Sequence, residues 1–208
     1  MTSRNIKICV MISGGGTNLQ ALIDAEKKGI LHSGKISLVG SNNPDAYGLV
    51  RAAQNNIETF VAEDEDLIVT KLAEKKIDMI VLAGYLKILS ADFTDLYRNR
   101  IINVHPSLIP AFCGKGCYGL RVHEKALNYG VKVTGATVHF VNAVPDGGQI
   151  ISQKAVEVLE SDTPKTLQKR VMQEAEWVLL PEAAESVAAE LKNSERRGEP
   201  IPDVTKAH

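Results

Sequence analysis

Residues 6–29 of the chain, IKICVMISGGGTNLQALIDAEKKG, bring together the features that decide the fold. Apolar residues fill positions 6–12 apart from one lysine, which is typical of a strand, and consecutive glycines then end the run. A helical pattern follows over residues 18–28, with its apolar side chains on one face and Gly29 after its last turn. A strand, a glycine-rich turn and a helix in this order predict the first unit of an α/β fold.

The same alternation of strands and helices continues through the first half of the chain. The segment DMIVLA at residues 78–83 is apolar after its first residue, as expected of a central strand that helices cover on both faces. We therefore predict a mostly parallel sheet with ligand sites at the carboxyl ends of its strands. The predicted strands cover residues 6–12, 35–39, 57–61, 78–83 and 101–105, and the predicted helices cover residues 18–28, 46–55, 65–76 and 93–98.

The pattern changes after the strand that ends at residue 105. A loop rich in proline, glycine and cysteine covers residues 106–119, and a helical segment follows at residues 121–128. Two further strands, at residues 131–142 and 149–158, flank a Pro-Asp-Gly-Gly turn. This arrangement predicts an antiparallel hairpin at the end of the sheet.

The C-terminal part is predicted to be one long helical region over residues 163–193. Pro164 suits its first turn, whereas Pro181 is expected to kink or interrupt it. We predict a single domain over residues 1–193 and a polar, loosely held tail over residues 194–208.

The composition is that of a folded globular protein. Of the 208 residues, 44% are hydrophobic and 24% are charged, which excludes a mainly disordered chain. The formal net charge of −1 argues against a broad surface for nucleic acid or anionic membranes. No apolar run reaches the ~18 residues of a membrane span, and no secretory apolar segment is found. With three cysteines, a reduced cytoplasmic protein without a disulfide framework is expected.

The glycine loop SGGGTN at residues 13–18 is the first candidate binding site. Glycines let a ligand approach the backbone, and free N–H groups at a helix start attract an anion, so phosphate is the natural ligand. The loop lacks the Gly-Lys-Ser/Thr of a Walker A motif, and Leu19 replaces the third glycine of a dinucleotide fingerprint. A plain strand-to-helix turn, capped by Thr17 or Asn18, is the alternative.

Asn103 and His105 end a predicted strand, and strand alternation places both side chains on the same side. The amide and the imidazole can donate hydrogen bonds to one developing oxyanion, and the histidine can transfer a proton near neutral pH. The alternative, equally weighted, is a histidine that caps a loop or lies satisfied at the edge of the core. Asp146 lies in the Pro-Asp-Gly-Gly turn, where turn formation alone explains it, and spacing does not place it near His105.

The remaining histidines and cysteines show no metal-binding pattern. His123 and His139 lack metal-ligand spacing, and the spacing of Cys113 and Cys117 is non-standard for zinc. We expect free thiols and no metal. The apolar segment at residues 84–89 forms either ordinary core or one wall of a ligand pocket.

Four motifs, taken in order along the chain, resemble those of the phosphoribosylglycinamide formyltransferase family, also called GAR transformylases. They are SGGGTNLQAL from residue 13, VLAGYLKILS from residue 81, INVHPSLIP from residue 102, and GATVHFV from residue 135 with the Asp-Gly-Gly turn that follows it. The Asn-x-His-Pro-Ser-Leu block is shared with the wider superfamily of folate-dependent formyltransferases, and the glycine loop points to this member. The resemblance implies a Rossmann-like, three-layer α/β fold with about seven strands.

Members of this family move a formyl group from the co-substrate 10-formyltetrahydrofolate to the amine of 5′-phosphoribosylglycinamide in purine synthesis. The resemblance implies that Asn103, His105 and Asp146 meet in one catalytic site. Protonated His105 and the Asn103 amide would hold the oxyanion of a tetrahedral intermediate. Asp146 would raise the pKa of His105 and assist proton transfer.

Matching positions imply further contacts with both substrates. The residues implied to contact the glycinamide substrate are Gly16, Thr17 and Asn18 at its phosphate, Glu176 at its ribose, and Pro106 and Gln173 beside it. The residues implied to contact the folate are Leu86, Lys87, Ile88, Leu89, Asn103, Asn142, Ala143, Val144 and Asp146. The resemblance also implies small-molecule partners only and a monomer or homodimer.

The chain departs from the family pattern in a longer loop at residues 111–119 and in an acidic run at residues 63–66. Three other classes on related folds are the alternatives. A formyltetrahydrofolate deformylase is expected to carry an additional N-terminal domain and to lack the glycine loop. A folate- or nucleotide-binding module without turnover is expected to lack the intact catalytic trio. A nicotinamide oxidoreductase is expected to carry an acidic residue where residues 41–43 read SNN.

Overall fold

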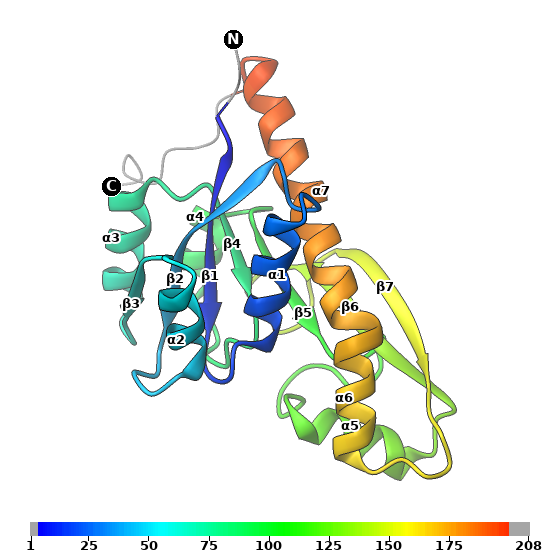
Figure 1. Cartoon of the computed structure of the whole chain (residues 1–208). Helices are drawn as coiled ribbons and strands as arrows, with labels where there is room; N and C mark the ends of the chain where they lie inside the picture. Colours follow the sequence, from blue (N-terminus) through cyan, green and yellow to red (C-terminus); the bar gives the residue numbers. More distant parts are fainter. Residues whose placement is uncertain (1–3, 200–208) are drawn as a thin grey trace.

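The structure is a computed structural model that describes residues 4–199 of the chain. Seven strands form one sheet in the order β3-β2-β1-β4-β5-β6-β7 (Figure 1). The strands are β1 (Ile6–Ile12), β2 (Gly34–Ser41), β3 (Thr59–Val61), β4 (Met79–Leu82), β5 (Ile101–His105), β6 (Val133–Phe140) and β7 (Ile150–Glu157). The predicted α/β fold with about seven strands is confirmed.

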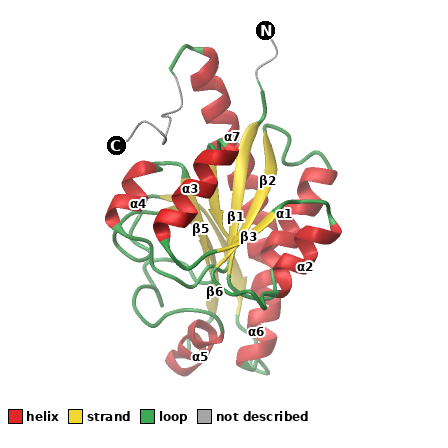
Figure 2. Cartoon of the chain, turned by 90° about the vertical axis from the view of Figure 1, so that its left-hand side faces the viewer, coloured by secondary structure: helices red, strands yellow, loops and turns green. Residues whose placement is uncertain are grey.

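Helices cover both faces of this sheet (Figures 1 and 2). Helices α1, α2, α6 and α7 bury their apolar faces on one side, and α3 and α4 bury theirs on the other. The bounds are α1 (Thr17–Lys27), α2 (Tyr47–Gln54), α3 (Glu65–Lys75), α4 (Ala91–Leu96), α5 (Leu120–Tyr129), α6 (Pro164–Val171), the π-helix η1 (Met172–Glu176) and α7 (Trp177–Arg196).

Strand β1 shows how the three layers are held together. Ile8 and Val10 belong to the core beneath α1 and α7, whereas Cys9 and Met11 belong to the core beneath α3 and α4. All four side chains are fully buried. Because burial of one large apolar side chain contributes about 1.5–3 kcal/mol, this strand stabilises both cores at once.

The sheet is parallel from β3 to β5 and antiparallel from β5 to β7. The predicted antiparallel hairpin is confirmed, but β6 and β7 are joined by residues 141–149 rather than by a tight turn. This connection is long enough to reach the carboxyl end of β5, where Asp146 lies near His105.

The C-terminal helical region begins as predicted, with Thr163 as N-cap and Pro164 in the first turn. The interruption expected at Pro181 is wrong, because α7 continues through that residue. Pro181 is buried together with Leu180 and Ala184, so packing against the sheet keeps the helix intact there. The irregular turn is instead the π-helix η1, which precedes α7.

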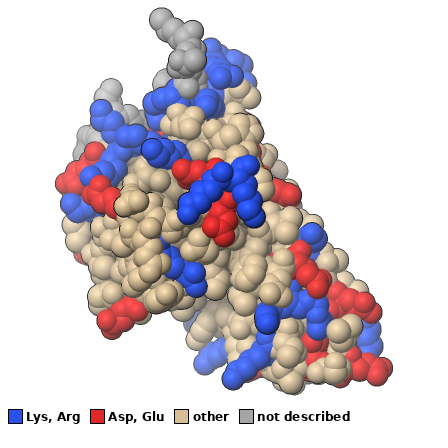
Figure 3. Space-filling model, viewed as in Figure 1, with Lys and Arg blue, Asp and Glu red and all other residues tan. Residues whose placement is uncertain are grey.

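Helix α7 also runs past the predicted domain end at residue 193, as far as Arg196. Residues 200–208 of the predicted tail lie outside the described residues, so its looseness stays a prediction. On the face shown in Figure 3, basic and acidic side chains lie interspersed in groups, one of them near the middle of the view, with uncharged surface between them. Within residues 4–199, no helix has both the length and the hydropathy that crossing a bilayer requires.

Candidate active site

A cavity of about 640 Å³ lies at the carboxyl ends of β4 and β5. This volume suits a small-molecule ligand, and the position is the one predicted for ligand sites of this fold. Its walls come from both strands, from the loop after β4, from the loop at residues 114–119, from residues 141–146, and from α6 and η1.

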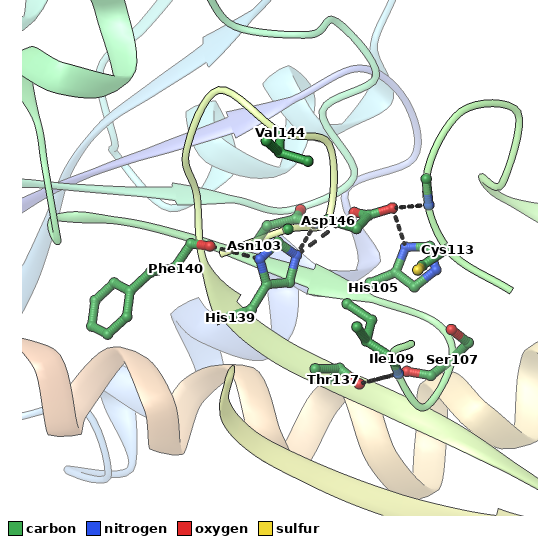
Figure 4. A network of polar contacts seen from close by, with 12 residues as sticks. Asn103, His105, Ser107, Ile109, Cys113, Thr137, His139, Phe140, Val144 and Asp146 are labelled. Atoms are coloured by element: carbon green, nitrogen blue, oxygen red, sulfur yellow. Dashed lines mark hydrogen bonds and ion pairs between the residues drawn. The ribbon is translucent and has the colours of Figure 1, made fainter. Parts of the chain in front are cut away.

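The structure brings Asn103, His105 and Asp146 together at this cavity (Figure 4). Asn103 and His105 lie on the same side of β5, as predicted, and Nδ1 of His105 lies 3.5 Å from Oδ2 of Asp146. Asp146 also accepts a hydrogen bond of 2.8 Å from the N–H of Gly114. Asp146 is therefore a turn residue whose carboxylate also faces His105. Formation of the turn alone does not explain this contact.

His139 is a fourth polar residue of this cluster, and sequence reasoning missed it. In the antiparallel pairing of β5 and β6, His139 lies opposite Asn103, and its Nε2 is 3.2 Å from the Asn103 Nδ2. Its Nδ1 donates to the carbonyl of Phe140 at 2.7 Å, and its Nε2 lies 3.7 Å from Oδ1 of Asp146. His139 therefore accepts a hydrogen bond from the Asn103 amide and orients it beside the carboxylate of Asp146.

Burial lowers the pKa of His105 below its usual value, although the Asp146 carboxylate and the Phe112 carbonyl both act to raise it. The predicted effect of Asp146, which raises the pKa, is present, but desolvation of an almost fully buried imidazole outweighs it. Both ring nitrogens face an acceptor, since Nε2 lies 3.0 Å from the carbonyl oxygen of Phe112. Because its pKa is lowered, the ring is mainly neutral at neutral pH in the free protein, so its single N–H can be donated to only one of these two acceptors.

Asp146 is ionised over the same range. Burial acts to raise its pKa, but the contact with His139, the charge of His105 and the Gly114 N–H together lower the pKa below its usual value. The site therefore places an ionised carboxylate beside a neutral imidazole, a combination suited to accepting and passing on a proton.

The glycine loop lies at the start of α1, next to the cavity. Gly16 has a φ of 69°, in the left-handed region that glycine adopts without strain. A Cβ on Gly16 would lie 2.6 Å from the Cα of Gly48, so the loop contacts the backbone of α2 closely. Nε of Arg51 donates to the carbonyl of Gly15 at 2.9 Å, which brings a positive charge to the loop.

Glu176 of η1 lies at the same end of the cavity and accepts a 2.7 Å hydrogen bond from Nδ2 of Asn18. Burial raises the pKa of Glu176 to about 7, and the hydrogen bond from Asn18 only partly opposes this effect. Because its carboxyl group has few hydrogen-bond donors around it in the free protein, Glu176 is able to accept hydrogen bonds from a ligand.

Because the folded pKa of Glu176 lies above its usual 4.5, the ionised form destabilises the fold. This cost is absent below pH 4.5, grows as the pH rises and is complete above about pH 7. We expect Glu176→Gln to leave the free energy of unfolding unchanged near pH 4.5 and to increase it at pH 8, by on the order of 3 kcal/mol. Denaturant unfolding at both pH values measures this difference. The exposed neighbour Glu174, changed to Gln, is the control, and equal pH dependence of both variants would contradict the assignment.

Two sides of the cavity carry apolar side chains that are unusually exposed. Leu86 and Ile88, on the loop after β4, are 61% and 67% exposed, and Val144 on the opposite loop is 61% exposed. Exposed apolar side chains that flank a cavity are typical of a site for a flat apolar ligand. The nearby acidic run is used locally, since Asp64 caps α3 and the Glu63 carbonyl accepts a hydrogen bond from Lys87.

The structure does not bring every predicted residue to the cavity wall. Gln173 is exposed and lies outside the wall, as does Ala143, and Gly16 and Thr17 lie beside the wall at the start of α1. The predicted residues that do line the cavity are Asn18, Leu86, Lys87, Ile88, Leu89, Asn103, His105, Pro106, Asn142, Val144, Asp146 and Glu176.

His123 of α5 also lines the cavity and was not among the predicted site residues. It is fully buried, and neither ring nitrogen has a hydrogen-bond partner within the described residues. Burial, followed by the nearby His105, lowers the pKa of His123 to about 4, so it is neutral. Between residues 4 and 199, no three histidine, cysteine or acidic side chains are grouped to hold a metal ion.

Comparison with known proteins places this geometry in a family. The chloroplastic phosphoribosylglycinamide formyltransferase of Vigna unguiculata is 38% identical over 91% of this chain, and the enzyme of that name from Haemophilus influenzae is 41% identical over 84%. The chain spans 84% of the bacterial relative but only 63% and 62% of the plant proteins from Vigna unguiculata and Arabidopsis thaliana.

A solved phosphoribosylglycinamide formyltransferase from Anaplasma phagocytophilum superimposes with a TM-score of 0.82 at 38% identity. The match covers 90% of this chain and 89% of that one. A family model described as formyl transferase matches residues 6–183. The chain belongs to the formyl transferase family.

Proposed function

We propose that the protein transfers a formyl group from 10-formyltetrahydrofolate to the amine of 5′-phosphoribosylglycinamide, a step of purine biosynthesis. The observation that carries this proposal is the convergence of Asn103, His105 and Asp146 at one cavity. Exposed apolar side chains lie on one side of these groups, and the glycine loop lies beyond Asn18 on the other. The apolar end of this site suits a pterin, and the end at the glycine loop suits a phosphorylated acceptor.

The proposed reaction begins when the glycinamide amine attacks the formyl carbon and the carbonyl oxygen becomes an oxyanion. Nδ2 of Asn103 donates to this oxyanion, as does the N–H of His105 once it turns from its acceptor in the free protein. Asp146 accepts the proton that the attacking amine loses, directly or through water, and the pKa of His105 rises beside the developing negative charge, so the ring takes up this proton from Asp146. The oxyanion then re-forms the carbonyl, the bond from the formyl carbon to the folate nitrogen breaks, and His105 gives the proton to that nitrogen.

The glycinamide substrate is placed with its phosphate at Gly16, Thr17 and Asn18. The N–H groups at the start of α1 and the nearby Arg51 both favour an anion there. Glu176 is placed to accept hydrogen bonds from ribose hydroxyls, and Pro106 lies beside the substrate. Gln173 is left out of this proposal because it is exposed and does not line the cavity.

The folate is placed between the two exposed apolar walls. Residues 86–89 form one wall, and Asn142 with residues 144–146 forms the other. Leu86, Ile88 and Val144 would lose exposed apolar surface on binding a pterin, and each ~100 Å² that they bury contributes about 2.5 kcal/mol.

An absorbance assay of folate deformylation, run with and without phosphoribosylglycinamide, tests this function. We expect turnover of 10-formyltetrahydrofolate only when the glycinamide is present. Turnover without the glycinamide would identify a deformylase, and folate binding without turnover would identify a binding module; either result contradicts the proposal. A cytoplasmic location and a monomer or homodimer remain predictions, and the names of the plant relatives state a chloroplastic location.

A further inference from the structure

The loop between β5 and α5 carries two cysteines on either side of a tight turn. Cys113 and Cys117 flank Gly114-Lys115-Gly116, and the N–H of Cys117 donates to the carbonyl of Gly114 at 3.0 Å. Gly114 and Gly116 have φ angles of 81° and 80°, which let the chain reverse between the two thiols. Cys117 therefore ends this turn, and Cys113 immediately precedes it.

Lys125 of α5 lies directly against one of these thiols. Its Nζ is 2.9 Å from Sγ of Cys117 and 3.4 Å from the carbonyl of Gly116. A neighbouring ammonium group stabilises the thiolate, which is the reactive form of cysteine. Cys117 is also partly exposed, so a small oxidant in solution can reach it.

Cys113 is in a different environment. Its Sγ donates to the carbonyl of Pro110 at 3.2 Å. Partial burial, the Asp146 carboxylate and Cys117 together raise the pKa of the Cys113 thiol. Cys113 thus stays protonated and suits the second, resolving role of a thiol pair, whereas Cys117 suits the first.

The same loop holds two of the groups at the cavity through its backbone. The carbonyl of Phe112 lies 3.0 Å from Nε2 of His105, and the N–H of Gly114 donates to Asp146 at 2.8 Å. These two backbone groups flank Cys113 in the chain. A displacement of the backbone at Cys113 would therefore move the partners of His105 and Asp146.

We propose that Cys117 and Cys113 form an oxidation site, in which a peroxide converts the two thiols into a disulfide within the loop and thereby slows turnover. The Cys117 thiolate attacks one peroxide oxygen, the O–O bond breaks, and the first water leaves after protonation. The sulfur of Cys113 then attacks the sulfur of the Cys117 sulfenic acid, the S–O bond breaks, and the second water leaves with the Cys113 proton. Two thiols are oxidised, one peroxide is reduced, and a dithiol reductant reverses the change.

The disulfide is expected to displace the backbone of residues 112–114, because Sγ of Cys113 must leave the Pro110 carbonyl to reach Cys117. A misplacement of catalytic groups by ~1 Å is able to lower a rate by about 10²-fold. The effect on turnover rests on the proposed function, but formation of the disulfide does not.

Mass spectrometry of the peroxide-treated protein, after alkylation of its free thiols, tests the disulfide by itself. We expect the peptides of Cys113 and Cys117 to be linked and to lose two hydrogen atoms. Cys9 is the internal control, because it is fully buried in β1 and burial strongly raises the pKa of its thiol. The proposal is wrong if both loop thiols stay open to alkylation, or if Cys9 is oxidised as fast as they are.

Two variants test the roles of the individual side chains. Cys117→Ser is expected to abolish the linked peptide. Lys125→Gln is expected to slow its formation severalfold, because the ammonium group that lies 2.9 Å from Sγ of Cys117 would no longer stabilise the attacking sulfur. Lys28→Gln, an exposed lysine at the end of α1, is the matched control. Equal rates for the two lysine variants would contradict the assignment of Lys125.

Turnover of each protein is then measured before peroxide, after peroxide and after reduction. Each rate is divided by the rate of the same protein before peroxide. We expect a reversible loss in the unmodified sequence and none in Cys117→Ser. An unchanged rate in a fully bridged protein would overturn the coupling to the site. If the protein shows no formyl transfer at all, the mass measurement still decides whether the disulfide forms.

Discussion

The His105→Ala variant is expected to lose about 10²–10³ in kcat, with little change in its affinity for phosphoribosylglycinamide. The expectation follows from the position of the ring at the carboxyl end of β5, with the Asp146 carboxylate 3.5 Å from its Nδ1. A donor that acts only on the oxyanion stabilises the transition state and not the bound substrate, so the loss appears in kcat rather than in KM.

Asn103→Ala is expected to show the same pattern, because its amide is the second donor. The loss in a double variant should be less than the product of the single losses, since the two groups act on one oxygen. His32→Ala is the control, because His32 is an exposed histidine that pairs with Glu185 and lies outside the cavity wall. Near-normal turnover in either the His105 or the Asn103 variant would show that the oxyanion is held elsewhere.

Asp146→Asn is expected to lower kcat by about 10²–10⁴-fold, because the amide keeps the shape of the side chain and loses its basic form. The pKa of Asp146 is below its usual value, so the carboxylate stays ionised across the neutral range and loses activity only in acid. The rate of the original protein should therefore be insensitive to the ionisation of Asp146 at neutral pH.

A pH–rate profile of Asp146→Asn separates this role from a structural one. With the carboxylate removed, the pKa of His105 falls further, because Asp146 is the main group that raises it. Asp92→Asn, an exposed change at the start of α4, controls for the loss of one surface charge. A normal rate and profile in Asp146→Asn would exclude proton transfer through this side chain.

Much of the fold could be predicted because its signals are local. The apolar run of β1 and the glycines after it lie within a few residues, and strand alternation placed Asn103 and His105 on one side of β5. Asp146 was linked to His105 only through the resemblance to a family, because the 141–149 connection folds back in a way that spacing does not encode.

The features that were missed depend on long-range packing. His139 joins the site only because β6 pairs with β5 in a particular antiparallel register. The effect of Asp146 on the pKa of His105 was predicted, but the larger, opposite effect of burial was missed because the extent of burial is not visible in the sequence. Pro181 was expected to kink or interrupt α7, but the helix continues through this residue, which is buried with its neighbours.

The π-helix η1 has a further consequence for how this site can change over evolutionary time. A π turn holds one residue more than an α-helical turn, so it corresponds to a single-residue insertion within a helix. Removing one residue from Met172–Glu176 would restore a regular helix and rotate one side of it by about 100° relative to the other. Either Glu176 would leave the cavity, or Leu180 and Ala184 would leave the core. A one-residue deletion in this segment would therefore disturb either the cavity or the core, whereas a substitution there leaves the length of the segment unchanged.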